Sequence, residues 1–261
     1  MKVPYFFILA LGLFVLSSCV NEDEGKGNDD ASETVDLTVT FKGTFGDDPL
    51  QMYEGEYAYE DNTNIRLQLF QFYVSNLYLE SLEKSAPDSM PLIDIELVSF
   101  LDMISMEDAQ RGVEITIPDV PVGTYNELYM GLGVSPDYNA TQPGDYTPPH
   151  PLDDHYWSWA RGYVFAKVEG NVDYDRDGTY DEKLTFHLGE NDYYRTLHIE
   201  EPIVIGPSNT SLTFTVDLER VLKDGTGDHV DFRQVTQDHT NDLDLVRFMM
   251  DNLQAAVKLE Q

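Results

Sequence analysis

Alternating apolar and polar positions dominate the chain and predict short β-strands. Val35, Leu37, Val39 and Phe41 alternate with polar residues, as the two faces of a half-buried strand require. The same alternation, or a short apolar run, recurs at 65–79, 113–117, 128–134, 163–168, 184–188, 197–205 and 212–218. Turn-forming residues separate these segments, as in Ser135-Pro136-Asp137. We therefore expect an antiparallel β-sandwich of roughly eight to ten strands.

Only the C-terminal region follows a helical period. Leu243, Val246, Leu253 and Ala256 fall roughly on one face of a helix over 243–259, which Asn241 or Asp242 would cap. No internal repeat is visible, and the length of 34–261 fits one β domain or two small ones; because no linker forces a split, we expect one domain. The expected fold class is all-β with a short C-terminal helix.

The first residues have a different character and predict export. Lys2 precedes an apolar run over 3–16, which is short for a membrane span and typical of a signal peptide. The tetrapeptide 16–19, Leu-Ser-Ser-Cys, matches a bacterial lipobox, so we expect 1–18 to be removed and Cys19 to be acylated. An uncleaved N-terminal helix is the alternative. Cys19 is the only cysteine, so the exported domain has no disulfide and no thiolate ligand.

An acidic tether and a strongly negative charge bear on location and partners. Residues 19–33 are rich in Asp, Glu, Gly and Asn and bury too little apolar surface to fold. An acidic run behind an acylated cysteine resembles the export signal of surface lipoproteins, which points to the outer membrane, on its periplasmic or its outer face. The formal charge of −32 argues against nucleic acid as a partner, because phosphates would be repelled. We expect contact with the membrane through the lipid anchor only.

The densest group of candidate metal ligands and oxidisable rings lies at 150–170, and it comprises His150, His155, Trp157 and Trp159. Neutral imidazole suits copper, zinc, iron or nickel. His187, which alternation places on the side of its strand away from Phe186, can join this group by strand pairing. The alternative is that both tryptophans pack in the core and that the histidines lie in loops, hydrogen-bonded to water.

A second candidate is the acidic loop that follows the strand at 163–168. Its D-x-D-x-D-G spacing consists of Asp173, Asp175, Asp177 and Gly178. Carboxylate oxygens suit Ca²⁺, and the glycine permits a sharp turn. The EF-hand pattern is incomplete because its twelfth position is Leu184, so Asp181 or Glu182 would complete the shell. A metal-free Asp-Gly turn between two strands is the alternative.

Enzyme signatures are absent from the sequence. It contains no G-x-S-x-G elbow, P-loop, H-E-x-x-H or G-x-G-x-x-G motif. A glycosidase pair stays open, because 48 acidic residues give many chance pairs. We expect a binding protein and not an enzyme. Clustered histidines would favour a metal-binding protein, whereas exposed aromatic rings on one flat face would favour a glycan- or protein-binding surface lipoprotein stabilised by calcium.

Five segments together carry a family resemblance: FYVSNL at 72–77, VPVGTY at 120–125, GLGV followed by DYN at 131–139, the stretch 157–170, and FHLG at 186–189. The W-x-W-x-x-G-Y-x-F element at 157–165 is the most specific. In this order they resemble the MbnP-like family of exported copper-binding proteins, which is associated with methanobactin operons and related to CorA-type proteins. The resemblance spans about 35–256.

This resemblance implies a β-sandwich over 34–261 that binds copper. In the family, a di-haem cytochrome c peroxidase of the MauG/MbnH type oxidises a tryptophan to kynurenine, which ligates copper together with histidines. Carried over, Trp157 or Trp159 would be oxidised. Because this chain has no histidine before His150, a copper site would need His150, His155 or His187.

Overall fold

The computed structural model describes residues 33–82, 86–157 and 161–260. The chain divides into two units, Met1–Ala31 and Ser32–Gln261, and every element below belongs to the second. The expected signal peptide, Cys19, most of the tether and Trp159 lie outside the described residues. Within the described ranges, no helix combines the length and the apolar character that crossing a membrane requires.

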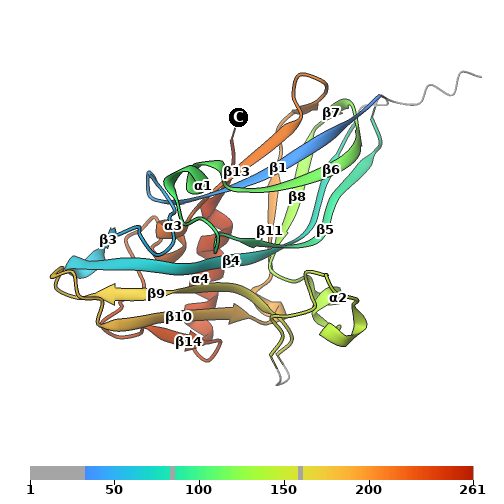
Figure 1. Ribbon diagram of the computed structural model, residues 1–261. Coiled ribbons are helices and arrows are strands. Elements are labelled where there is room, and N and C mark those ends of the chain that lie inside the picture. Colours follow the sequence, from blue (N-terminus) through green and yellow to red (C-terminus); the bar gives the residue numbers. More distant parts are fainter. Residues whose placement is uncertain (1–32, 83–85, 158–160, 261) are drawn as a thin grey trace, which may run out of the picture. The chain divides into compact units, whose positions relative to one another are not determined.

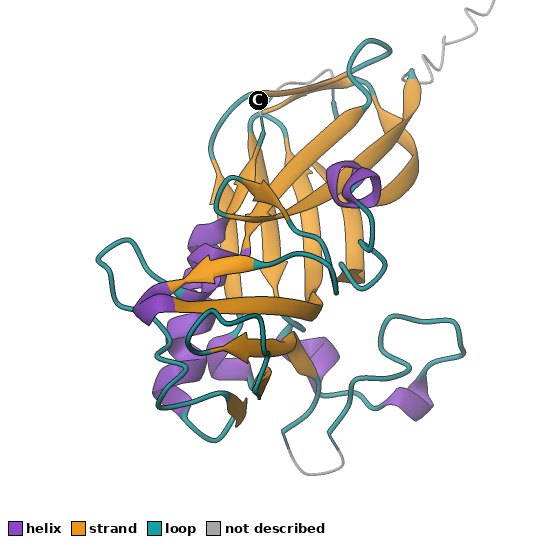
Figure 2. Ribbon diagram, turned by 60° about the vertical axis from the view of Figure 1, so that its left-hand side comes forward, coloured by secondary structure: helices purple, strands orange, loops and turns teal. Residues whose placement is uncertain are grey.

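Strands far outweigh helices in the described structure, which confirms the all-β sandwich (Figure 2). One sheet has the order β15-β13-β1-β2, with β6 also on β1, and its strands are β1 (Thr34–Phe45), β2 (Asp48–Pro49), β6 (Val113–Pro121), β13 (Ser211–Asp217) and β15 (Val257–Leu259). The other has the order β11-β8-β4-β9-β10-β14, with strands β4 (Thr63–Glu80), β8 (Glu127–Leu132), β9 (Val164–Asp173), β10 (Glu182–Gly189), β11 (Arg195–Ile199) and β14 (Gln237–His239). Two further strands, β3 (Tyr57–Tyr59) and β5 (Ser89–Ser99), pair with β4, and β7 (Gly123–Tyr125) pairs with β12 (Ile203–Ile205).

The pairing differs from the expected sandwich in two respects. Most neighbours are antiparallel, but β1 pairs with β13 and β10 pairs with β14 in parallel. The described residues hold fifteen strand segments, more than the eight to ten expected, because several have only two or three residues. Segments of that length are too short to show a period of two. The longer β5 was also missed, since Pro91 interrupts its pattern; β5 pairs only with β4, and an edge strand tolerates proline.

Strand β4 is the longest strand, with 18 residues, and it organises the second sheet. Its first half pairs with β9 and its second half pairs with β8, with an irregularity near Asn76, which has a positive φ of 50°. Figure 1 shows β9 and β10 side by side beneath β4, with α4 behind them. The strands β9, β10 and β14 thus extend the sheet on one half of β4.

Phenylalanine rings fill the space between the two sheets. Phe41 of β1 stacks on Phe214 of β13 with ring centroids 5.2 Å apart, and it meets Phe72 of β4 edge-on at 6.2 Å. Phe72 also contacts Phe70 and Phe100, and all five rings are at most 1% exposed. This cluster joins the sheets and fixes the face that each strand turns inward.

The helices are α1 (Met106–Arg111), α2 (Pro136–Asn139), α3 (Leu218–Leu222) and α4 (Leu243–Ala256), with 3₁₀ turns at Glu60–Asn62, Pro143–Asp145 and Asn191–Tyr193. As expected, α4 is the C-terminal helix, and the Asp242 side chain caps it by accepting from the backbone N–H groups of Asp244 and Leu245. It ends at Ala256 and not at 259, because the chain continues as β15 along β13. Its apolar face is buried, and it packs mainly against α3, where Asn252 Nδ2 donates to the Val221 carbonyl at 3.3 Å.

Candidate functional site

A polar row crosses four strands of the second sheet. Strand register places Gln71 of β4 beside Lys167 of β9, Lys167 beside His187 of β10, and His187 beside His239 of β14. Neighbouring Phe186 is buried in the core, so His187 points away from it, as the alternation predicts. The row therefore sets nitrogen-bearing side chains next to one another on the face opposite the core side of β10.

His187 is the centre of this row. Its Nδ1 lies 3.1 Å from Nδ1 of His239, and its Nε2 lies 2.7 Å from Oε1 of Glu169. A neutral His187 that donates from Nε2 to the carboxylate leaves the Nδ1 lone pair facing His239. Thr240 Oγ1 donates to the backbone oxygen of His187 at 2.8 Å, which fixes β14 against β10. A carboxylate on the second ring nitrogen is the usual support of a metal-ligating histidine.

His155 is a buried histidine whose pKa is lowered first by its burial and then by the charge of Lys167. Its Nδ1 is buried without a hydrogen-bond partner, and Asp154 Oδ2 is 4.0 Å from it. A buried nitrogen without a partner is uncommon, because desolvation without compensation costs free energy. The His155 backbone has a positive φ of 61°, which requires a local turn. The unpaired Nδ1 is suited to bind a metal ion through its lone pair.

His150, the third predicted ligand, has other partners. Its ring stacks on Tyr146 with centroids 4.0 Å apart, and its Nδ1 accepts from the backbone N–H of Leu152 at 3.0 Å. Both contacts lie within its own loop. Among the described residues, no hydrogen bond or ring contact joins it to His155, His187 or His239, so the structure does not place it in the histidine group.

Trp157 is buried beside this group, whereas Trp159 lies outside the described residues. The Trp157 side chain is 8% exposed and packs over Gly189, where an added Cβ would lie 2.7 Å from the indole Cζ3. Gly189 follows His187 by two residues, so the indole lies against the end of the strand that carries His187. The packing that was the alternative for the tryptophans thus holds for Trp157, and it places the indole at the end of the strand that carries His187.

His239 was not among the candidates from sequence. It lies in a three-residue strand, Gln-Asp-His, with no apolar alternation, and it reaches His187 only through the parallel β10–β14 pairing. The sole hint in the sequence is its position shortly before the cap of the C-terminal helix. Sequence pattern does not encode such long-range parallel register.

Protonation of the buried histidines makes folding pH-dependent. Burial lowers the pKa of His155 and of His187, and the Lys167 charge lowers the pKa of His155 further. An unfolded histidine titrates near about 6.5, so below that pH the unfolded chain binds more protons and stability falls until the folded pKa is passed. We expect His155→Phe to flatten the loss of unfolding free energy between about pH 7 and about pH 5.

His229 supplies a control of opposite sign. Its hydrogen bond to Asp61 raises the pKa of His229. The protonated ring therefore stabilises the folded chain at low pH, and this stabilisation is lost as the pH rises through the folded-state pKa. His229→Phe should therefore make the free energy of unfolding fall more steeply on acidification, whereas His155→Phe should make it fall less steeply. Urea denaturation at several pH values measures both, and parallel curves for the wild type and His155→Phe would contradict the assignment.

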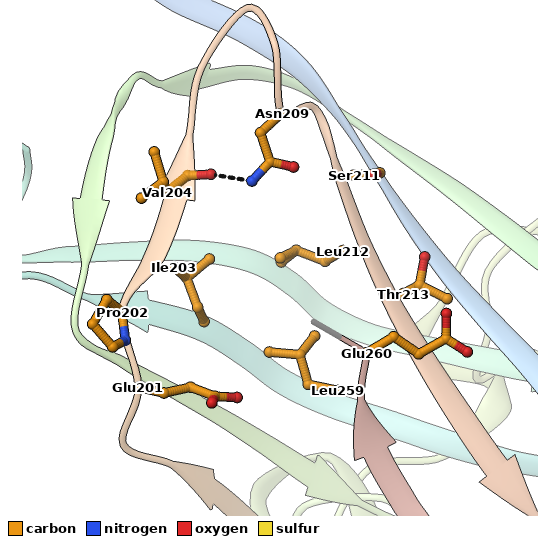
Figure 3. Close-up of a pocket in the computed structure, with 10 residues that line it drawn as sticks. All are labelled: Glu201, Pro202, Ile203, Val204, Asn209, Ser211, Leu212, Thr213, Leu259 and Glu260. Carbon is orange, nitrogen blue, oxygen red and sulfur yellow. Dashed lines mark hydrogen bonds between the residues drawn. The ribbon is translucent and has the colours of Figure 1, made fainter.

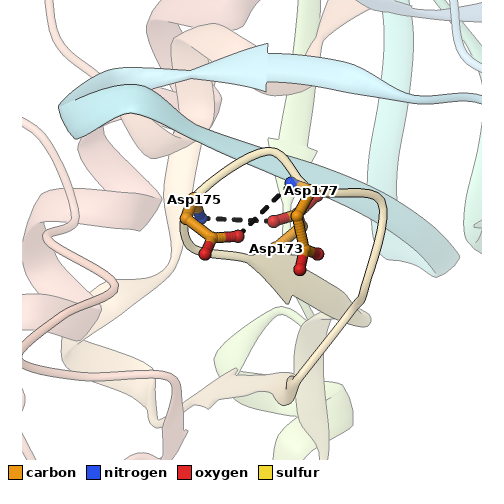
Figure 4. A group of neighbouring side chains, drawn as sticks. All are labelled: Asp173, Asp175 and Asp177. Carbon is orange, nitrogen blue, oxygen red and sulfur yellow. Dashed lines mark hydrogen bonds between the residues drawn. The ribbon is translucent and has the colours of Figure 1, made fainter.

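The acidic loop between β9 and β10 brings three of its five candidate ligands together. Carboxylate oxygens of Asp173, Asp175 and Asp177 lie within 4.8 Å of one another (Figure 4). Asp173 is fully buried and accepts hydrogen bonds from the N–H groups of Arg176 and Gly178 at 2.7 and 2.9 Å, so the turn also stands without a cation. The remaining candidates, Asp181 and Glu182, are exposed and do not belong to this group.

Two other surface features bear on the alternative of a glycan- or protein-binding protein. Tyr78, Tyr129 and His198 stack with centroids 4.9 and 4.2 Å apart, so most of their ring faces are turned toward one another and not toward a sugar. A groove of about 610 Å³ lies between β12, β13 and β15 (Figure 3). There, Asn209 Nδ2 donates a hydrogen bond to the Val204 carbonyl at 2.6 Å. Neither histidine nor tryptophan lines the groove.

Comparisons with known proteins agree with the resemblance seen in the sequence. The sequence profile of the MbnP family matches residues 34–244. The solved structure of MbnP from Methylosinus trichosporium superposes with a TM-score of 0.53 at 15% sequence identity, covering 82% of this chain and 87% of that one. At this identity the likeness shows a common fold. No curated protein sequence matches the chain.

Proposed function

Because this chain belongs to the MbnP family, we propose that it is a copper-binding protein in which His187 and His239 hold the ion and His155 completes the set. The observation that carries the proposal is the pair of Nδ1 atoms 3.1 Å apart. Two nitrogens bound to one ion at about 2.0 Å lie roughly 3 to 4 Å from each other, so the pair needs little movement to accept a metal.

The chemistry of the donor set favours Cu(I). Imidazole is a good ligand for copper, and a site with few ligands suits the monovalent ion. The unpaired Nδ1 of His155 gains a partner on binding, and Glu169 holds the His187 tautomer that leaves Nδ1 free to bind. Family membership supports a copper-related role, and the contact between His187 and His239, together with the buried unpaired Nδ1 of His155, supports these residues as its site.

We further propose that a tryptophan of the 157–159 element is oxidised to kynurenine by a di-haem cytochrome c peroxidase of the MauG/MbnH type. Two equivalents of hydrogen peroxide would supply the four-electron oxidation that opens the indole C2–C3 bond, and hydrolysis of the resulting N-formyl group would release the C2 carbon as formate. An intact indole is a poor copper donor, whereas kynurenine carries an amine and a carbonyl. The position of Trp157 over Gly189 supports a role beside the histidines. The protein would act by binding and not by turnover, as an outer-membrane lipoprotein anchored through Cys19.

The test is an anaerobic Cu(I) titration of the exported chain, purified with and without co-expression of a di-haem peroxidase. We expect one Cu(I) per chain, and, after co-expression, a mass change on the peptide that carries both tryptophans. The absence of copper binding in both preparations would overturn the copper proposal. Copper binding without a mass change would overturn only the tryptophan oxidation.

A second candidate property is calcium binding by Asp173, Asp175 and Asp177, favoured by their three converging carboxylates. Calcium at 100 times its Kd would stabilise the folded chain by about 2.7 kcal/mol. For a domain of this size, this corresponds to a rise in Tm of roughly 5–10 °C. Asp177→Asn should abolish the rise, whereas Asp181→Asn, outside the group, should retain it. Thermal melting in calcium and in EDTA measures the effect, and identical Tm values would count against a calcium site.

A further inference from the structure

The segment that carries His155 and Trp157 is a β-hairpin. The Trp157 N–H donates to the Gly162 carbonyl at 3.0 Å, and the Val164 N–H donates to the His155 carbonyl at 2.8 Å. A bridge between Tyr156 and Tyr163 lies between these two hydrogen bonds. His155 and Trp157 are therefore on one arm of the hairpin, and the other arm leads into β9.

Three successive residues at the end of β10 and directly after it hold this hairpin. Gly189 lies under the Trp157 ring, and Glu190 Oε1 lies 3.1 Å from Nε of Arg161. The third residue, Asn191, accepts a hydrogen bond from Asn139 Nδ2 at 2.9 Å. All three follow within four residues of His187, so the contacts tie the hairpin to the strand that carries the central histidine.

Asn139, the last residue of α2, is the centre of these contacts. Its Oδ1 accepts from the Tyr163 N–H at 2.7 Å, while its Nδ2 donates to Asn191. Gly162 lies so close that an added Cβ would be 2.2 Å from Asn139 Oδ1, and Gly162 has a positive φ of 76°. One side chain therefore links the hairpin to the segment after β10, and a neighbouring glycine makes room for it.

We propose that Asn139 is a positioning residue, which holds the hairpin so that His155 and Trp157 face the His187–His239 pair. The inference rests on the proposed copper function. Without Asn139, the hairpin keeps its internal hydrogen bonds but loses its link to Asn191. His155 and the indole then sample positions away from the pair, and the site is less well organised before the ion arrives.

The test compares Asn139→Ala and Asn139→Asp with Asn209→Ala, a control that removes an asparagine–backbone hydrogen bond at the groove of Figure 3. For the fluorescence measurement each variant is made in full-length Trp159→Phe protein, so that Trp157 alone emits, and for the Cu(I) measurement each is made in the full-length chain with both tryptophans. We expect Asn139→Ala to raise acrylamide quenching of Trp157 severalfold and to weaken Cu(I) binding by roughly 10- to 100-fold, as for other outer-shell residues. Asn139→Asp, which keeps the oxygen acceptor for Tyr163, should recover part of both losses.

The outcomes separate this inference from the proposed function. Cu(I) affinity and quenching at reference values in Asn139→Ala would overturn the positioning role and leave copper binding intact. A chain with both tryptophans and Asn139 intact that binds no Cu(I) would overturn the proposed function and this inference with it. Should Asn139→Ala not fold, Asn191→Ala removes the same link from the other side and gives the same comparison.

Discussion

Replacing His239 with alanine is expected to lower the affinity for Cu(I) about a hundredfold or more, because even outer-shell partners of metal ligands contribute roughly 10- to 100-fold. His239 Nδ1 faces His187 Nδ1 at 3.1 Å, and its removal leaves the ion with one fewer imidazole. His187→Ala should have an equal or larger effect, since His187 also contacts Glu169. Competition with a colorimetric Cu(I) chelator under anaerobic conditions measures each affinity.

Two further variants are expected to change the Cu(I) affinity less than His239→Ala does. His150→Ala should leave the Cu(I) affinity unchanged, because His150 stacks on Tyr146 and bonds within its own loop. Glu169→Gln should weaken binding by roughly 10- to 100-fold, since the neutral amide no longer fixes the His187 tautomer. Wild-type affinity in His239→Ala, or a loss in His150→Ala as large as that in His187→Ala, would place the copper site elsewhere.

Replacing Phe72 with alanine is expected to lower the free energy of unfolding by about 3–5 kcal/mol, the usual range for truncating a buried phenylalanine. Phe72 is fully buried and contacts rings from both sheets, with Phe41 on one side and Phe70 and Phe100 on the other. Its removal opens a cavity where the sheets meet, and the paired strands on either side limit how far that cavity can collapse. Urea denaturation followed by tryptophan fluorescence measures the change.

Phe72→Leu is the matched variant, because it keeps most of the apolar volume. Phe72→Leu should lower the free energy of unfolding clearly less than Phe72→Ala does, since it leaves less empty volume in the core. Because Phe72 pairs with Ala166 of β9, one residue from Lys167, the alanine variant should also weaken Cu(I) binding at concentrations of urea that leave the wild type folded. A loss below about 1 kcal/mol in Phe72→Ala would show that the rings do not join the sheets as described.

Local patterns in the sequence were enough to predict the longer strands other than β5, and the start of the C-terminal helix. Alternation around Phe186 correctly placed His187 off the core side, and Asp242, one of the two candidate caps, begins α4. Pairing between distant segments was not predictable in the same way. In the parallel β10–β14 pair, residues 185–187 lie beside residues 237–239, some fifty positions further along the chain. A local hydrophobic period gives no information about such a contact.

The same contrast between local pattern and long-range pairing explains which residues of the candidate site were predicted from the sequence. His155 and His187 were found because they lie in segments with a recognisable motif or strand pattern. His150 shares the motif but turns into its own loop, where ring stacking on Tyr146 and a backbone hydrogen bond outweigh any approach to the other histidines. His239 carries no motif, and only the register of β14 brings it to His187.

The polar row from Gln71 to His239 draws on four strands that are far apart in the chain. Contacts of such long range form slowly, because the intervening loops must close first. A chain that is threaded unfolded through a membrane therefore has no assembled copper site, since a metal site is part of the folded state. Metal loading would then wait for folding on the far side of that membrane, and the chain would carry no copper with it during transit.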